Sequence, residues 1–113
     1  MSGLIVKQKL SYFVTGTTIA IPFSLVGFLS EPIQYIGVLM KADAPYTLRL
    51  RDLSGSLLNE KNGTATNQTE IIVMGGELNL TCPMIVVLEA ESTQLLGIYE
   101  LNLATLCLCE SSF

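Results

Sequence analysis

Ten carboxylates are the side chains with which this sequence could carry out acid–base chemistry. A glycosidase, for example, needs two of them across a cleft, one held protonated by its surroundings. Nearly all of these residues fall at turns or on the outward side of alternating stretches, where solvation is the ordinary reason for a carboxylate. We therefore expect no catalytic pair and no enzymatic activity. The ten are Glu31, Asp43, Asp52, Glu60, Glu70, Glu77, Glu89, Glu91, Glu100 and Glu110.

The absence of His and the presence of three Cys limit metal and nucleophile chemistry. Without His, imidazole catalysis and His metal sites are excluded. Cys107 and Cys109 are two residues apart, so in a strand they point to the same side and cannot easily form a disulfide. Cys82 stands alone before Pro83. We interpret the thiols as small buried hydrophobic groups, and we expect no metal and no cofactor.

The low charge and high hydrophobicity of the chain restrict the classes of partner that it can bind. The net charge is −4, and clustered Lys and Arg, which binding to a phosphate backbone requires, are missing. Only 14% of the residues are charged and half are apolar. A domain this small cannot hide so much apolar material inside itself. We expect no nucleic acid, and we place the apolar excess at subunit contacts, at a partner surface or in a membrane.

The elements that must position these side chains are strands. In residues 46–60 (YTLRLRDLSGSLLNE), Leu alternates with Arg, turn residues follow, and a second apolar run begins, which predicts a β-hairpin. Alternation recurs elsewhere, and no stretch has helical periodicity. The residues expected on the core face are Leu48, Leu50, Leu78, Leu80, Val86, Leu101 and Leu103.

Residues 10–30 are uncharged and long enough to form one transmembrane span or the core of a signal peptide. Residues 18–25 alternate between apolar and small or polar side chains, however, which favours a strand over a span. Pro22 within this stretch predicts an edge strand or a bulge. Gly37 predicts a bulge in the next strand.

The rest of the chain is predicted to form short strands joined by turns. Runs that are apolar on both faces of the strand are expected to have both of those faces buried. Together these elements predict one all-β domain over residues 1–113, an antiparallel β-sandwich of the jelly-roll kind with roughly eight to ten short strands. The assignments are a loop at 59–68, strands at 70–74 and 77–81, a doubly buried run at 85–88, a turn at 90–94, and a strand at 97–104 with Tyr99, Leu101 and Leu103 on one face.

The order of elements resembles that of the small capsid cement or decoration proteins of tailed bacteriophages. A Thr-rich strand, the YTLRLRDLSGSLL hairpin, an Asn/Thr loop and a late GIYELNL strand carry this resemblance, which is one of pattern over most of the chain. It implies a non-enzymatic virion structural protein on the capsid surface. Such a protein would form a homotrimer and contact the major capsid protein or another virion protein.

Two other classes stay open. The final strand also resembles that of carbohydrate-binding modules, in which exposed aromatic rings stack on sugars. A membrane-anchored or secreted adhesion domain, located outside the cell, is the third possibility and would depend on residues 10–30. The candidate sugar-stacking residues are Tyr12, Tyr35, Tyr46 and Tyr99.

Runs without a polar face mark where subunits would meet. If a strand is apolar on both faces, one face can serve the core and the other a neighbouring copy. A closed ring hides such a face without growing a filament. The interface candidates are Ile71, Val73, Ile85, Val87, Leu106 and Leu108.

Overall fold

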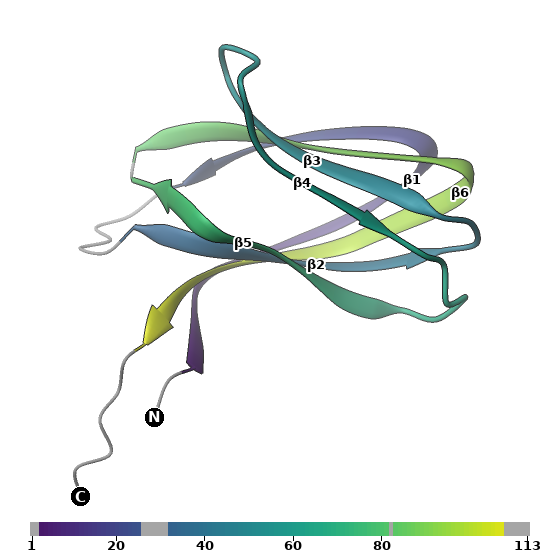
Figure 1. Cartoon of the computed structure of the whole chain (residues 1–113), viewed down its shortest axis with the longest axis horizontal. Helices are drawn as coiled ribbons and strands as arrows, with labels where there is room; N and C mark the ends of the chain where they lie inside the picture. Colours follow the sequence, from purple (N-terminus) through teal and green to yellow (C-terminus); the bar gives the residue numbers. More distant parts are fainter. Residues whose placement is uncertain (1–2, 26–31, 82, 108–113) are drawn as a thin grey trace, which may run out of the picture.

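A computed structural model describes residues 3–25, 32–81 and 83–107, and all regular structure in these residues is β-strand (Figure 1). The strands form one antiparallel sheet that is nearly closed into a barrel. The predicted all-β class and antiparallel pairing are therefore confirmed. The strands are β1 (Gly3–Leu25), β2 (Ile33–Ala42), β3 (Tyr46–Asp52), β4 (Leu57–Gly63), β5 (Glu70–Leu80) and β6 (Met84–Cys107).

The frame of the sheet is the pairing of β1 with β6, which runs from Gly3 opposite Cys107 to Leu25 opposite Met84. The other edge of β6 pairs with β3 in its first half and with β2 in its second half. β4 then pairs with β3, and β5 with β2. The sheet thus has two halves that share β1 and β6 and enclose one core, here called the β3–β4 half and the β2–β5 half (Figure 1).

The predicted number of strands is wrong, because the described residues hold six strands, two of them very long. Residues 90–94, expected to turn, lie within β6, but the register of β6 against β1 jumps there, from Glu91 opposite Thr18 to Leu96 opposite Gly16. The Ser92 hydroxyl in this stretch donates a hydrogen bond of 2.9 Å to the Pro45 carbonyl and accepts one of 3.3 Å from the Gln94 N–H. Gly75 and Gly76, with φ of 111° and 110°, lie inside β5 and join its two predicted pieces.

The alternation that predicted the core is confirmed. In the second half of β1, the apolar residues of 18–25 are buried and the residues between them are exposed. β1 pairs only with β6 among the described strands, so Pro22 lies in an edge strand, as predicted. All seven expected core residues are buried: Leu48, Leu50, Leu78, Leu80, Val86, Leu101 and Leu103.

Two predicted faces are wrong. Ile85 is 43% exposed and Val87 is only partly buried, so residues 85–88 bury one face. Tyr99 does not share the inward face of Leu101, because the register of β6 against β2 shifts at this point. Tyr99 instead lies near Gly97 and stacks on Phe13, with ring centroids 5.9 Å apart.

The predicted loop at 59–68 is only half correct, because β4 extends to Gly63. Gly63 pairs with Tyr46, whose ring occupies the place that a Cβ at residue 63 would need. Glycine is therefore required in this strand for close packing and not for a turn. Burial raises the pKa of the Tyr46 hydroxyl, and the nearby Glu70 carboxylate adds to that rise.

Residues 10–25, considered above as part of a span, belong to β1. No helix long and apolar enough to cross a membrane occurs in the described part of the chain.

We predict that Leu50→Ala lowers the free energy of unfolding by ~2–5 kcal/mol, because Leu50 is fully buried and its loss leaves a cavity. Leu57→Ala, at a half-exposed position of the neighbouring strand, is the control and should change it by about 0.5 kcal/mol or less. Urea denaturation measures both. Equal losses would contradict the register of this hairpin.

Candidate functional site

The outer face of the β3–β4 half carries a row of paired charged side chains, here called the charged ladder. Arg49 donates through Nε to Glu60 at 2.9 Å and through Nη2 to Glu91 at 2.8 Å. Arg51 donates through Nε to Glu89 at 2.8 Å. The hydrogen bonds to Glu91 and Glu60 raise the pKa of the Arg49 guanidinium. These pairs are solvated and contribute little to stability, so this face is the polar strand face that the sequence predicts.

The outer face of the β2–β5 half is built differently. Strand pairing places three rows of side chains across β1, β6, β2 and β5. In the middle row, Lys9 is opposite Asn102, Asn102 is opposite Gly37, and Gly37 is opposite Val73. Because Gly37 has no side chain, the face sinks at this point.

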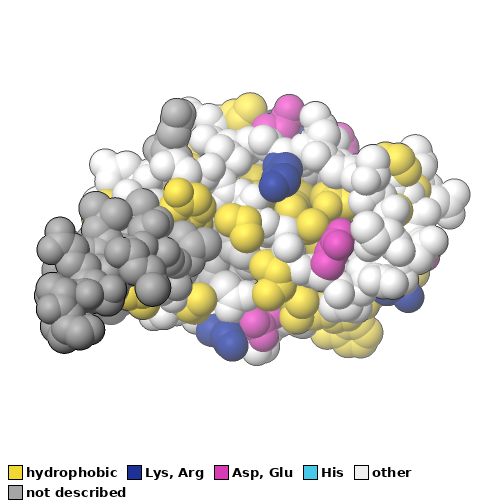
Figure 2. Space-filling model, turned by 60° about the horizontal axis from the view of Figure 1, so that its bottom comes forward, with side chains coloured by type: hydrophobic (Ala, Val, Ile, Leu, Met, Phe, Trp, Pro, Cys, Tyr) yellow, Lys and Arg dark blue, Asp and Glu magenta, His cyan; other side chains and the backbone are white. Residues whose placement is uncertain are grey.

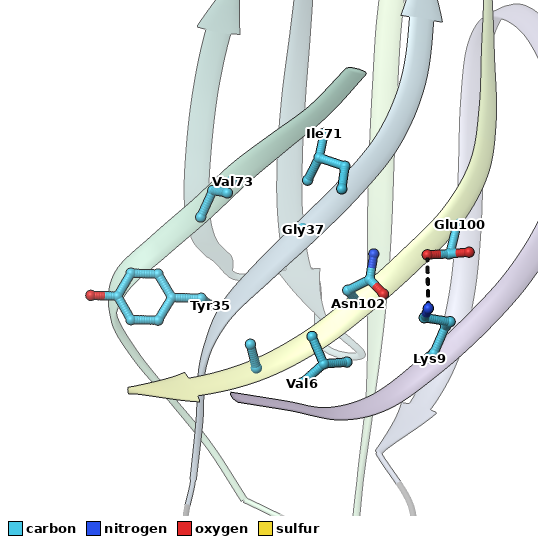
Figure 3. Close-up of a pocket in the computed structure, with 9 residues that line it drawn as sticks. Val6, Lys9, Tyr35, Gly37, Ile71, Val73, Glu100 and Asn102 are labelled. Carbon is cyan, nitrogen blue, oxygen red and sulfur yellow. Dashed lines mark ion pairs between the residues drawn. The ribbon is translucent and has the colours of Figure 1, made fainter. Parts of the chain in front are cut away.

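The resulting hollow has a volume of about 290 Å³ and is open to the outside. Figure 3 shows apolar side chains on several sides of its glycine floor and the polar Asn102, Lys9 and Glu100 on the remaining side. The space-filling view from this side shows hydrophobic side chains grouped between single charged ones (Figure 2). Besides the middle row, the lining residues are Val6, Tyr35, Ile71, Glu100 and Ala104.

Gly37 keeps the hollow open. A Cβ at this position would come within 3.3 Å of Ile71 Cγ2 and 3.6 Å of Asn102 Cβ. The register passes through Gly37 without a shift, so the bulge predicted at this glycine is wrong. The irregularity in β2 against β6 lies between Leu39 and Met40.

Asn102 is the unusual side chain of this hollow. It is 8% exposed, and its carboxamide makes no hydrogen bond to another described residue. No buried side-chain nitrogen or oxygen in the described structure lacks a partner, so this carboxamide is open to the hollow. It offers two donors and one strong acceptor, which any molecule that covers it must satisfy. Thr105, on the same strand and 2% exposed, instead donates its hydroxyl to Gln34 Oε1 at 3.0 Å. The free amide of Asn102 is available to a molecule that enters the hollow (Figure 3).

One ion pair borders the hollow. Lys9 Nζ lies 3.7 Å from Glu100 Oε1, and the Lys9 side chain is 60% exposed. The pair is long for a direct contact, so Lys9 can also meet an acidic group of an incoming partner.

A second, smaller hollow of about 160 Å³ lies beside the Phe13–Tyr99 stack. Tyr99 and Gly97 line it together with Lys41 and Asp43. Phe13 is 79% exposed, so its ring presents an open aromatic face next to polar groups.

The structure does not bring all predicted interface residues together. Ile71 and Val73, 56% and 39% exposed, line the hollow of the β2–β5 half. Ile85 and Val87 lie in the first half of β6, on the outer face of the β3–β4 half. The Leu106 side chain and all of Leu108 lie outside the described residues.

Some predicted groups lie outside the described part of the chain, namely the thiols of Cys82, Cys107 and Cys109 and the ring of Tyr12. Others are already paired. Of the carboxylates, Glu60, Glu89 and Glu91 bind arginines. No group of three metal-binding side chains is found in residues 3–25, 32–81 and 83–107.

Sequence reasoning missed Val6, Tyr35 and Asn102 as members of one site. They belong to three strands, and only the register shows that they meet. The available signal was the polar Asn102 between Leu101 and Leu103, which alternation places on the outer face.

Comparison with known proteins identifies no relative: no family model, curated protein or solved structure matches the chain.

We predict that Asn102→Leu leaves the free energy of unfolding unchanged or raises it, because the Asn102 amide is open to the hollow, makes no hydrogen bond to the rest of the fold, and is replaced by an apolar group of similar size. Thr105→Val is the matched control. It should lower the free energy of unfolding by ~1 kcal/mol, since it removes the hydrogen bond to Gln34. Thermal and urea unfolding measure both changes. A larger loss for Asn102→Leu than for Thr105→Val would show that the amide supports the fold.

Proposed function

We propose that this protein is a non-enzymatic structural protein of a virion, a capsid decoration protein of the jelly-roll sandwich type. In this proposal its copies associate with one another and with a capsid shell. The outer face of the β2–β5 half is the contact surface.

One observation carries the proposal: exposed apolar side chains gather around a hollow on one outer face of the sheet. Val6, Ile71 and Val73 are all at least 39% exposed there. Contiguous apolar patches on a small domain are usually interaction sites. The charged ladder on the other half gives the molecule one face suited to water and one suited to a protein partner.

In this proposal the two halves of the nearly closed sheet act as the two layers of the sandwich. Both halves contribute inward side chains, such as Leu50 and Val38, to one core. The two outer faces are then free to bind.

A carbohydrate-binding module is the second candidate, and the Phe13–Tyr99 stack favours it. An exposed ring held by a second ring is a rigid platform on which a sugar can stack, with Lys41 and Asp43 nearby for hydroxyl groups.

The main proposal predicts self-association and binding to shells. Light scattering should give a mass of several chains, and the protein should co-sediment with tailed-phage capsids stripped of their decoration protein. Ile71→Glu should weaken both, since it places a charge in the apolar face, whereas Ile85→Glu on the other half is the control and should weaken neither. A monomer that stays in the supernatant would contradict the proposal.

If the protein is a carbohydrate-binding module, it should bind a soluble oligosaccharide. A glycan array or calorimetry measures this binding. Phe13→Ala should reduce the affinity about tenfold, because the stacking ring is lost. Leu53→Ala, at an equally exposed apolar position away from the ring, should not change it. Binding that survives Phe13→Ala would place the sugar elsewhere.

A further inference from the structure

The turn between β3 and β4 projects from the sheet and carries an apolar side chain at its tip. Figure 1 shows this turn extending beyond the neighbouring strands. Leu53 lies in it and is 72% exposed. Such a side chain adds nothing to the core, and its place on a projecting turn leaves it accessible to another molecule.

The turn is held rigidly. Asp52 Oδ1 accepts hydrogen bonds from Ser54 Oγ at 2.6 Å and from the Ser56 N–H at 2.9 Å. The Gly55 N–H donates to the Asp52 carbonyl at 3.0 Å, and Arg51 Nη1 donates to the Gly55 carbonyl at 3.1 Å. These bonds fix the turn before any partner arrives, which lowers the entropy lost on binding.

The backbone beside the exposed side chain is free to bind. The N–H and C=O of Leu53 take part in none of the hydrogen bonds within the described structure. The tip therefore presents one aliphatic side chain together with an unpaired peptide group.

The hollow of the β2–β5 half offers groups that match both. Apolar side chains line part of its wall, and the amide of Asn102 is open to it and makes no hydrogen bond within the described structure. Its volume of about 290 Å³ is at the lower limit for small-molecule sites, about 300–1,000 Å³. A single aliphatic side chain with its peptide group is an occupant of suitable size.

We propose that Leu53 of one copy inserts into this hollow of a second copy. The Asn102 amide then binds the exposed peptide group of the turn. In this contact Lys9 at the rim, whose pair with Glu100 is long at 3.7 Å, turns to the acidic Asp52 beside the inserted side chain. The hydrogen bonds from Ser54 and Ser56 lower the pKa of Asp52 and keep it ionised.

This contact rests on the proposed assembly function and specifies its geometry. The turn belongs to the β3–β4 half and the hollow to the β2–β5 half, so each copy offers a donor on one half and an acceptor on the other. Such a head-to-tail contact is heterologous. It generates a closed ring, or a filament if the rotation between copies does not close.

Mixing two variants tests the contact. Leu53→Ser removes the inserted side chain and keeps the hollow, whereas Val73→Asp damages the hollow and keeps the turn. Each variant alone should bind itself roughly 30-fold more weakly than the wild type, the effect of losing a central anchor. Mixed together, they should form a 1:1 dimer, because one intact turn and one intact hollow remain. Analytical ultracentrifugation of the full chain measures all three samples.

Leu95→Ser is the control for the loss of an exposed leucine, since Leu95 is 57% exposed and lies outside both the turn and the hollow of the β2–β5 half. It should associate like the wild type. In the mixture, the side-chain amide signals of Asn102 in isotope-labelled Leu53→Ser protein should shift, which locates the contact in the hollow. Unfolding midpoints equal to that of the wild type should show that both variants fold.

Three outcomes overturn the inference. A wild-type monomer would remove both this contact and the assembly function. An oligomer insensitive to Leu53→Ser would leave the assembly function standing and show that another group fills the hollow. Two association-deficient variants that fail to complement each other would mean that the interface is not head-to-tail.

Discussion

The pairing of the first strand with the last along their whole length is the constraint on which the structure depends. β1 and β6 are 23 and 24 residues long, and every other strand is attached to β6 directly or through β2 or β3. This pairing joins Gly3 to Cys107, so the chain must close its largest loop to form its frame. The inner strands gain both neighbours only when β6 is in place, which makes the fold strongly non-local.

The same constraint separates what the sequence predicts from what it does not. Burial follows from alternation, which is local, and the core positions such as Leu50 and Leu101 could be predicted without knowing any partner. Strand length could not be predicted, because residues 90–94 have turn chemistry and yet lie within the continuous strand β6. The turn chemistry appears as an irregularity of the pairing: the register of β6 against β1 jumps between Glu91 and Leu96, and pairing with β3 ends at Ser92.

The candidate site was less predictable than the core for a related reason. The apolar character of Ile71 and Val73 predicted that they lie on an outer face as interface residues. It did not predict which residues lie beside them. Their neighbours Asn102 and Val6 come from the two ends of the chain and join them only through the register of four strands. A shift of one residue in any of these pairings would turn a wall of the hollow into the core.

Gly37 and Asn102 are the two residues of this face that support a binding role. Glycine inside a strand costs about 0.5–1 kcal/mol relative to alanine, and asparagine is also disfavoured in strands. These two unfavourable choices are direct cross-strand partners, on β2 and β6. One opens the floor and the other places an unused hydrogen-bonding group in it. Local choices that weaken a sheet at one shared point are the pattern expected where a sequence serves binding and not folding.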